Sequence, residues 1–125
     1  MTRKEYTGVR DLSFSGWIRE NLPDSYSGFR VSDLDFILAN VQTKRFMCLE
    51  VKTRGADVKK WQRELFQLLH TCISAGVKCA KPEWEYLGMH LVTFTNTLFA
   101  DGDVFLDKKL ITETDLKSFL SMENA

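Results

Sequence analysis

The stretch LDFILANVQTKRFMCLEVKTRG, residues 34–55, contains two apolar runs of strand length joined by a short polar segment. The runs cover 34–39 and 45–51, and the five residues between them are few enough to form the loop of a β-hairpin. The second run also carries Glu50 and Lys52, which are separated by a single valine. Since a core strand loses stability when it takes up charge, these two side chains either face solvent or take part in chemistry.

The pairing within this hairpin predicts which charged side chains meet. Side chains alternate between the two faces of a strand, so Glu50 and Lys52 share one face of the second run. If the hairpin is symmetric about Gln42 and Thr43, the numbers of paired residues sum to 85 and Asp35 lies directly opposite Glu50. Their Cβ atoms are then roughly 5 Å apart, although a register slip of one residue would break the pairing.

The spacing of apolar residues and the turn residues place the other elements. The sequence predicts a short helix over 14–22 closed by Pro23, a loop over 24–32, a helix over 57–75 stopped by Gly76, strands over 89–96 and 104–106, and a terminal helix after a capping box over 112–115. The order α-β-β-α-β-β-α is typical of an α/β fold with one mixed sheet flanked by helices. A length of 125 residues favours a single domain over 1–125.

Composition limits the class of protein without deciding its function. Seventeen basic residues balance seventeen acidic ones, so net charge neither favours nor excludes a nucleic-acid partner. Three cysteines without a disulfide-like spacing fit a reducing compartment. The sequence shows no signal-peptide pattern and no apolar run of membrane-spanning length. We therefore expect a soluble cytoplasmic protein with no membrane partner.

Two carboxylates this close on a half-buried sheet repel each other and need compensation. One solution is a shared proton, which raises the pKa of one of them. Another is a hard divalent cation such as Mg²⁺, which prefers oxygen ligands. Lys52 can place an ammonium where negative charge develops or an attacking water sits. The alternative is a solvent-facing strand on which Asp35, Glu50 and Lys52 form surface ion pairs, which contribute little to stability.

The helix over 57–75 adds two features to this group. On a helical wheel Gln62 falls well inside the apolar arc, so we expect its amide to be buried and hydrogen-bonded near the two carboxylates. Lys59, Arg63 and His70 cluster along one edge of that arc. This basic stripe is either a phosphate-contacting surface or an ordinary solvated flank.

Together these residues resemble the PD-(D/E)XK nuclease superfamily over roughly 14–96, and most of all small members such as archaeal-type Holliday junction resolvases and VRR-type nucleases. Asp35 stands in SDLDFIL, and Glu50-Val51-Lys52 follows fifteen residues later in CLEVKTR. The stretch QRELF, 62–66, is similar to the Gln-x-x-x-Tyr element of some branches, with phenylalanine in place of the tyrosine. The proline-aspartate of the family name is absent, and Asp33 is a rival to Asp35 because it shares the same strand face.

The resemblance implies a restriction-endonuclease-like core and hydrolysis of DNA phosphodiester bonds with Mg²⁺ or Mn²⁺. Asp35 and Glu50 would bind the metal, Lys52 would orient the water, and Gln62 would orient the metal site or the substrate. The further candidate ligands are the Val51 carbonyl and Glu20 on the first helix.

The implied partner is DNA, in repair, recombination or the replication of a mobile element. The residues expected to contact it are Lys59, Arg63 and Arg54. A homodimer is compatible with the resemblance. The alternative function is a catalytically inactive nucleic-acid-binding or assembly module of the same fold.

Overall fold

The computed structural model describes residues 13–122, which fall into two units, one up to Ser32 and one from Asp33 onward. The first unit contains helix α1 (Ser13–Asn21) and a single 3-10 turn over Ser25–Ser27. The predicted helix over 14–22 is confirmed, and it ends before Pro23 because proline disfavours the helical conformation in the residue that precedes it. The expectation of a single domain stays a prediction.

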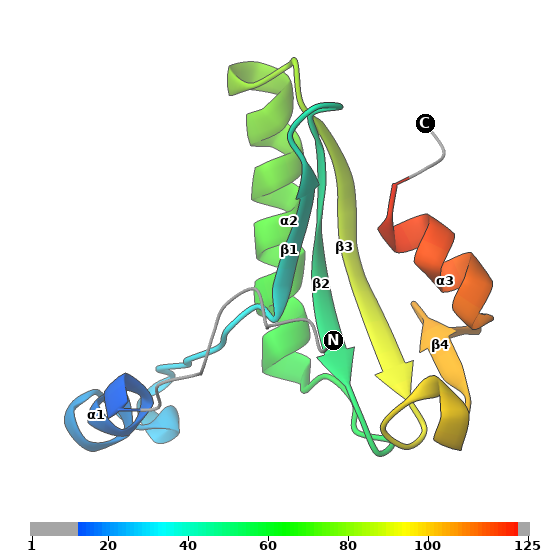
Figure 1. Cartoon of the computed structure of the whole chain (residues 1–125). Coiled ribbons are helices and arrows are strands. Elements are labelled where there is room, and N and C mark those ends of the chain that lie inside the picture. The colour runs from blue at the N-terminus through cyan, green and yellow to red at the C-terminus, as the bar shows by residue number, and fades with distance from the viewer. Residues whose placement is uncertain (1–12, 123–125) are drawn as a thin grey trace. The chain divides into compact units, whose positions relative to one another are not determined.

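The second unit is built around a mixed five-stranded sheet (Figure 1). Its strands follow the order β1-β2-β3-β4-β5, and its elements are β1 (Phe36–Asn40), β2 (Arg45–Lys52), α2 (Lys60–Ala80), β3 (Glu85–Phe94), β4 (Val104–Leu106), β5 (Lys109–Leu110) and α3 (Glu113–Leu120). The pair β2–β3 is parallel and the other three pairs are antiparallel. Two parallel neighbours need a crossover connection, which α2 supplies. The α/β class with a mixed sheet is therefore confirmed.

The register of the β1–β2 hairpin is the one that symmetry predicts. Phe36 pairs with Leu49 and Asn40 pairs with Arg45, so the residue numbers of each pair sum to 85. The Asn40 side chain holds the turn, because its Oδ1 accepts hydrogen bonds from the backbone N–H groups of residues 42 and 43 at 2.9 and 3.1 Å. This turn sets the register of the β1–β2 pairing. The register in turn determines on which face of the sheet each charged side chain lies.

The two faces of the sheet have different roles. On one face Leu49, Val92 and Val104 pack against Leu116 of α3 and form the buried core cluster. Because side chains alternate, Glu50 points to the opposite face, the one that α2 covers. The sheet thus separates an apolar core on the α3 side from a polar site on the α2 side.

Several predicted boundaries were wrong for identifiable reasons. Helix α2 runs past Gly76 and ends at Ala80, since glycine inside a helix costs only about 1 kcal/mol, whereas Pro82 stops it. It also begins later than predicted, because Lys59 is extended at φ −68° and ψ 153°. Strand β3 starts at Glu85, four residues before the predicted start.

The C-terminal part of the unit agrees with the predicted pattern and adds one strand to it. The side chain of Thr112 caps α3 by accepting a hydrogen bond from the Asp115 backbone N–H at 3.1 Å. The short strand β5 was not predicted, because two residues carry no periodicity. Within residues 13–122, none of the helices combines the length and apolar character that a bilayer crossing demands.

Candidate functional site

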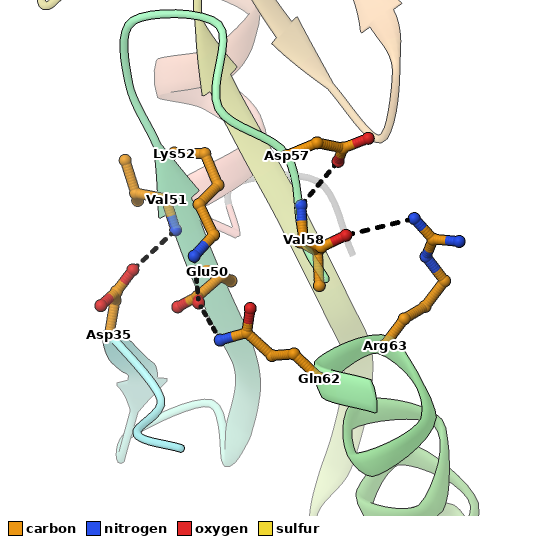
Figure 2. Close-up of polar contacts among 8 residues, drawn as sticks. All are labelled: Asp35, Glu50, Val51, Lys52, Asp57, Val58, Gln62 and Arg63. Atoms are coloured by element: carbon orange, nitrogen blue, oxygen red, sulfur yellow. Dashed lines mark hydrogen bonds and ion pairs between the residues drawn. The ribbon is translucent and has the colours of Figure 1, made fainter. Parts of the chain in front are cut away.

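Glu50 is a buried carboxylate on an interior strand of the sheet. It lies on β2, between β1 and β3, and only 3% of the residue is exposed. Its Oε2 accepts a hydrogen bond from Gln62 Nε2 at 3.0 Å and lies 3.5 Å from Lys52 Nζ. Figure 2 shows Asp35 on one side of this carboxylate and Gln62 on the other. Among the described residues, Glu50 Oε1 is the buried side-chain atom that has no hydrogen-bond partner.

The surroundings of Glu50 favour its protonated form. Burial, followed by a hydrogen bond that the protonated carboxyl can make to Asp35 and by the charge of Asp35, raises the pKa of Glu50 to about 7 against the opposing charge of Lys52. The buried carboxyl of Glu50 therefore meets the exposed carboxyl of Asp35 and the partly exposed ammonium of Lys52. A bound cation would reverse this preference, since it stabilises the ionised form of both carboxyls.

Asp35 immediately precedes β1 and reaches across the hairpin. Its Oδ2 accepts a hydrogen bond from the backbone N–H of Val51 at 2.8 Å. This contact fixes the carboxylate beside Glu50, as the predicted register requires. The sequence left Asp33 as a rival, and the observed contact is made by Asp35. The resemblance also implied that the Val51 carbonyl oxygen binds the metal, and this stays a prediction. The observed contact of Val51 with Asp35 is made by its amide N–H.

Glu50 and Gln62 are buried, so β2 does not present the Glu50 side chain to solvent. Gln62, in the first turn of α2, is 8% exposed and bonded to Glu50, so the predicted burial of its amide is confirmed. Lys52 is one-quarter exposed at its side chain and reaches the carboxylate from the solvent side. The alternative of ordinary surface ion pairs is therefore wrong for Glu50, of which only 3% is exposed.

The other predicted site residues lie outside this group. Glu20 belongs to α1, in the first unit, and its part in the site stays a prediction. Arg54 is in the turn after β2 at φ 55°, and its N–H donates to the Asn96 carbonyl at 2.7 Å. Lys59 precedes α2 instead of lying within it, so the predicted helical stripe is broken at that end.

Arg63 lies in the first turn of α2 and contacts the segment that leads into this helix. Its guanidinium donates to the Val58 carbonyl at 3.3 Å. Figure 2 shows this contact beside the one between Asp57 and the Val58 amide. Arg63 and the partly buried His70 line the same cavity, which opens next to Glu50.

One ion pair near the site could not be predicted from the sequence. Asp57 Oδ1 lies 2.6 Å from Lys108 Nζ, and the two residues are 51 positions apart. The hydrogen bond from Lys108 holds the pKa of Asp57 below its usual range. No local pattern connects residues this distant, so only the fold brings them together.

The chemistry of the donor set fits a small divalent cation. Mg²⁺ is usually held by one or two carboxylates together with waters and substrate phosphates. Asp35 and Glu50 supply two carboxylates, and Glu50 Oε1 has an unused acceptor site. Across residues 13–122 there is no cluster of three or more His, Cys, Asp and Glu side chains that could hold a metal. A cation here would therefore depend on water and phosphate for its remaining ligands.

Comparison with known proteins gives one similar sequence. An uncharacterized protein of Archaeoglobus fulgidus is 28% identical over 113 residues, which cover 86% of this chain and 72% of that protein. No family model and no solved structure matches the chain. The assignment of function therefore depends on the geometry of the site.

Proposed function

We propose that this chain is a divalent-metal-dependent nuclease of the PD-(D/E)XK type that hydrolyses phosphodiester bonds in DNA. The observation that carries the proposal is the buried Glu50 carboxylate, one oxygen of which has no partner, beside Asp35 and Lys52. A buried acceptor left unpaired costs about 1–3 kcal/mol. A cation between Asp35 and Glu50 would satisfy that oxygen and remove the repulsion between the two carboxylates.

In this mechanism each side chain has a separate task. Gln62 holds one oxygen of Glu50, and the Val51 amide holds one oxygen of Asp35, so both carboxylates keep fixed directions. Asp35 and Glu50 would hold a Mg²⁺ or Mn²⁺ ion, which would supply Lewis-acid chemistry toward the phosphate and a more acidic water. Lys52 orients that water with its ammonium and stabilises the negative charge that develops on the phosphate.

The DNA backbone would lie along the start of α2. Lys59 and Arg63 are exposed there, and Arg54 is exposed in the turn that precedes it. Cations of this kind contact phosphates without reading sequence. The proposed setting is the cytoplasm, which the cysteine composition favours, and a homodimer is compatible with it.

The test is a cleavage assay on the purified full chain with branched, single-stranded and duplex DNA, in Mg²⁺ or Mn²⁺. The variants are Asp35→Asn and Lys52→Ala, and Asp33→Asn is the matched control on the same segment. We expect the parent and the control to cut and the two site variants to be nearly inactive. If Asp35→Asn and Lys52→Ala cut as well as the parent, the activity belongs to a contaminant or another site.

A second candidate is a binding or assembly module that does not cut. The observation in its favour is the pKa of Glu50, since a carboxyl that holds its proton to about pH 7 can remain buried without a cation. Calorimetric titration with Mn²⁺ distinguishes the two candidates. Heat of binding that disappears in Asp35→Asn supports the nuclease, whereas a folded parent that binds no Mn²⁺ supports the module.

A further inference from the structure

A cavity of about 280 Å³ opens beside the site. It lies between α2, strand β3 and the turn that connects β4 to β5. Its floor is formed by Glu50, Met89 and Leu91, and Phe66 of α2 forms one wall. All of its lining residues belong to the second unit. Because Glu50 is part of the floor, whatever enters the cavity lies next to the proposed catalytic group.

The charges around the cavity balance each other. Its rim carries the cations Arg63 and Lys108 and the anions Asp57 and Asp107. Lys108 Nζ is 2.6 Å from Asp57. Asp107 uses both carboxylate oxygens, one toward the Leu91 backbone N–H at 2.8 Å and one toward a ring nitrogen of a histidine at 2.7 Å. The rim has no net positive charge to attract a phosphate. It therefore suits an uncharged ligand that carries hydrogen-bond donors and acceptors.

The floor and wall fit a flat, apolar group. Phe66, Met89 and Leu91 are all partly buried and present hydrocarbon or sulfur to the cavity. Small-molecule sites generally begin at about 300 Å³, so this cavity has room for a single ring system and not for a larger ligand. A flat ring beside an aromatic side chain, with polar groups at the rim, is the arrangement that binds a nucleobase.

The rim is held in place by a two-residue hairpin turn. Asp107 and Lys108 connect β4 to β5 with φ 49° and 71°, both in the left-handed region that residues other than glycine seldom adopt. The contacts of Asp107 to β3 stabilise this conformation and present Lys108 toward the cavity. The Asp107 carboxylate is thus anchored to β3 before a ligand arrives.

We propose that this cavity binds one unpaired nucleobase of the DNA strand whose backbone lies at Glu50. The inference rests on the proposed function, because it takes DNA as the ligand. A base inside a duplex is stacked on both faces and cannot enter a pocket unless it leaves the helix. The preferred substrate is then a single strand, a frayed end or a branch point, and not an intact duplex.

The experiment compares two short single strands of equal length, one with all its bases and one made of abasic sugar-phosphate units. Both carry the same phosphates, so the electrostatic part of binding is the same for each. Binding to the full chain is measured by fluorescence anisotropy in EDTA, where no metal-dependent cleavage occurs. The variants are Phe66→Ala, which removes the wall, and Gln67→Trp, which fills the cavity from an exposed position on its lining. The matched control is Leu68→Ala, which changes a 60% exposed residue of the same helix outside the cavity lining.

We expect the parent to bind the strand with bases about 5- to 100-fold more tightly than the abasic strand, which is the range for stacking of one base. Phe66→Ala and Gln67→Trp should remove this difference, and Leu68→Ala should keep it. Equal binding of both strands by the parent overturns the proposal, and so does a difference that survives Gln67→Trp. Since Gln67 is exposed, that variant remains informative if Phe66→Ala does not fold.

Failure of this proposal can be told apart from failure of the proposed function. A chain that discriminates the two strands in EDTA but cuts no DNA with Mg²⁺ or Mn²⁺ retains the base pocket and is not a nuclease. A chain that cuts duplex and single strands equally and ignores the bases is a nuclease without this pocket.

Discussion

Gln62 and Glu50 meet at 3.0 Å in the interface between α2 and the sheet, and both residues are buried. The amide donates to one carboxylate oxygen and so fixes the direction in which the other points. Twelve positions separate the two residues, and the helix start must be placed correctly for the contact to form. This contact connects the position of α2 to the geometry of the proposed metal site.

Gln62→Ala should destabilise the folded protein and weaken cation binding. Loss of the amide removes a buried hydrogen bond to a charged group and leaves Glu50 with one partner fewer, which costs about 1–3 kcal/mol of unfolding free energy. Urea denaturation at pH 8 in EDTA measures this cost. Gln67→Ala, at an exposed glutamine of the same helix, is the control and should change stability by less than about 0.5 kcal/mol. Equal effects of the two changes would contradict the role given to Gln62.

The apo protein should lose stability as pH rises from about 4.5 to 7. Burial raises the pKa of Glu50 from 4.5 to about 7 in the folded state. Its contribution is fully present below the unfolded pKa and is lost as pH rises through the folded pKa, by up to ~3 kcal/mol. Denaturation in EDTA at pH 5 and pH 8 measures the loss. Glu50→Gln should flatten this dependence, and an equal slope in parent and variant would exclude Glu50 as its source.

Asp35→Asn should abolish most metal binding without harming the fold. Asparagine keeps an oxygen that can accept from the Val51 amide, and the substitution removes the repulsion between two carboxylates. We therefore expect apo stability to be equal to that of the parent or higher, while Mn²⁺ affinity falls because a charged ligand is lost. Calorimetric titration and thermal unfolding of the same sample test both outcomes. Asp33→Asn should leave the Mn²⁺ affinity unchanged.

Lys52→Ala should spare metal binding and lower turnover. The ammonium lies 3.5 Å from Glu50, where it can stabilise charge that develops during hydrolysis. Removal of such a donor lowers turnover by about 10² or more. Single-turnover cleavage with saturating Mn²⁺ measures this effect separately from cation affinity. A variant with normal turnover and weak Mn²⁺ binding would make Lys52 a part of the metal site and not a catalytic group.

Lys59 and Arg63 should contribute to the salt dependence of DNA binding. Each phosphate contact releases condensed counterions, so changing both residues to alanine should reduce the slope of log affinity against log salt by roughly two contacts. Lys78 and Lys81, at the far end of α2, provide a matched double-alanine control with the same loss of charge. If both doubly substituted proteins show the same dependence of DNA affinity on salt, the start of α2 does not contact DNA specifically.

The sequence predicted the features that depend on residues close together along the chain. The β1–β2 register follows from side-chain alternation and a short turn, so the pairing of residues 36–40 with 45–49 and the place of Asp35 next to this hairpin were predicted correctly. The burial of Gln62 follows from helical spacing even though the predicted start of α2 was wrong. The end of α2 was missed because Pro82 outweighs Gly76 as a stop.

What could not be predicted depends on residues that are distant along the chain. Lys108 reaches Asp57 across 51 positions through a turn of left-handed residues, neither of which is glycine. Short-range sequence patterns carry no information on such a contact. The cavity is formed by the same long-range arrangement, so its presence beside Glu50 became visible only in the folded structure.

The contact between Asp35 and the Val51 amide spans 16 positions, and the one between Gln62 and Glu50 spans 12, so the whole site lies between residues 35 and 62. Contacts over short loops form early in folding, because they cost little chain entropy. We infer that the carboxylates come together while the β3 and β4 strands are still being added, and that their repulsion acts on the folding transition state. Divalent cations should then accelerate folding and not merely slow unfolding.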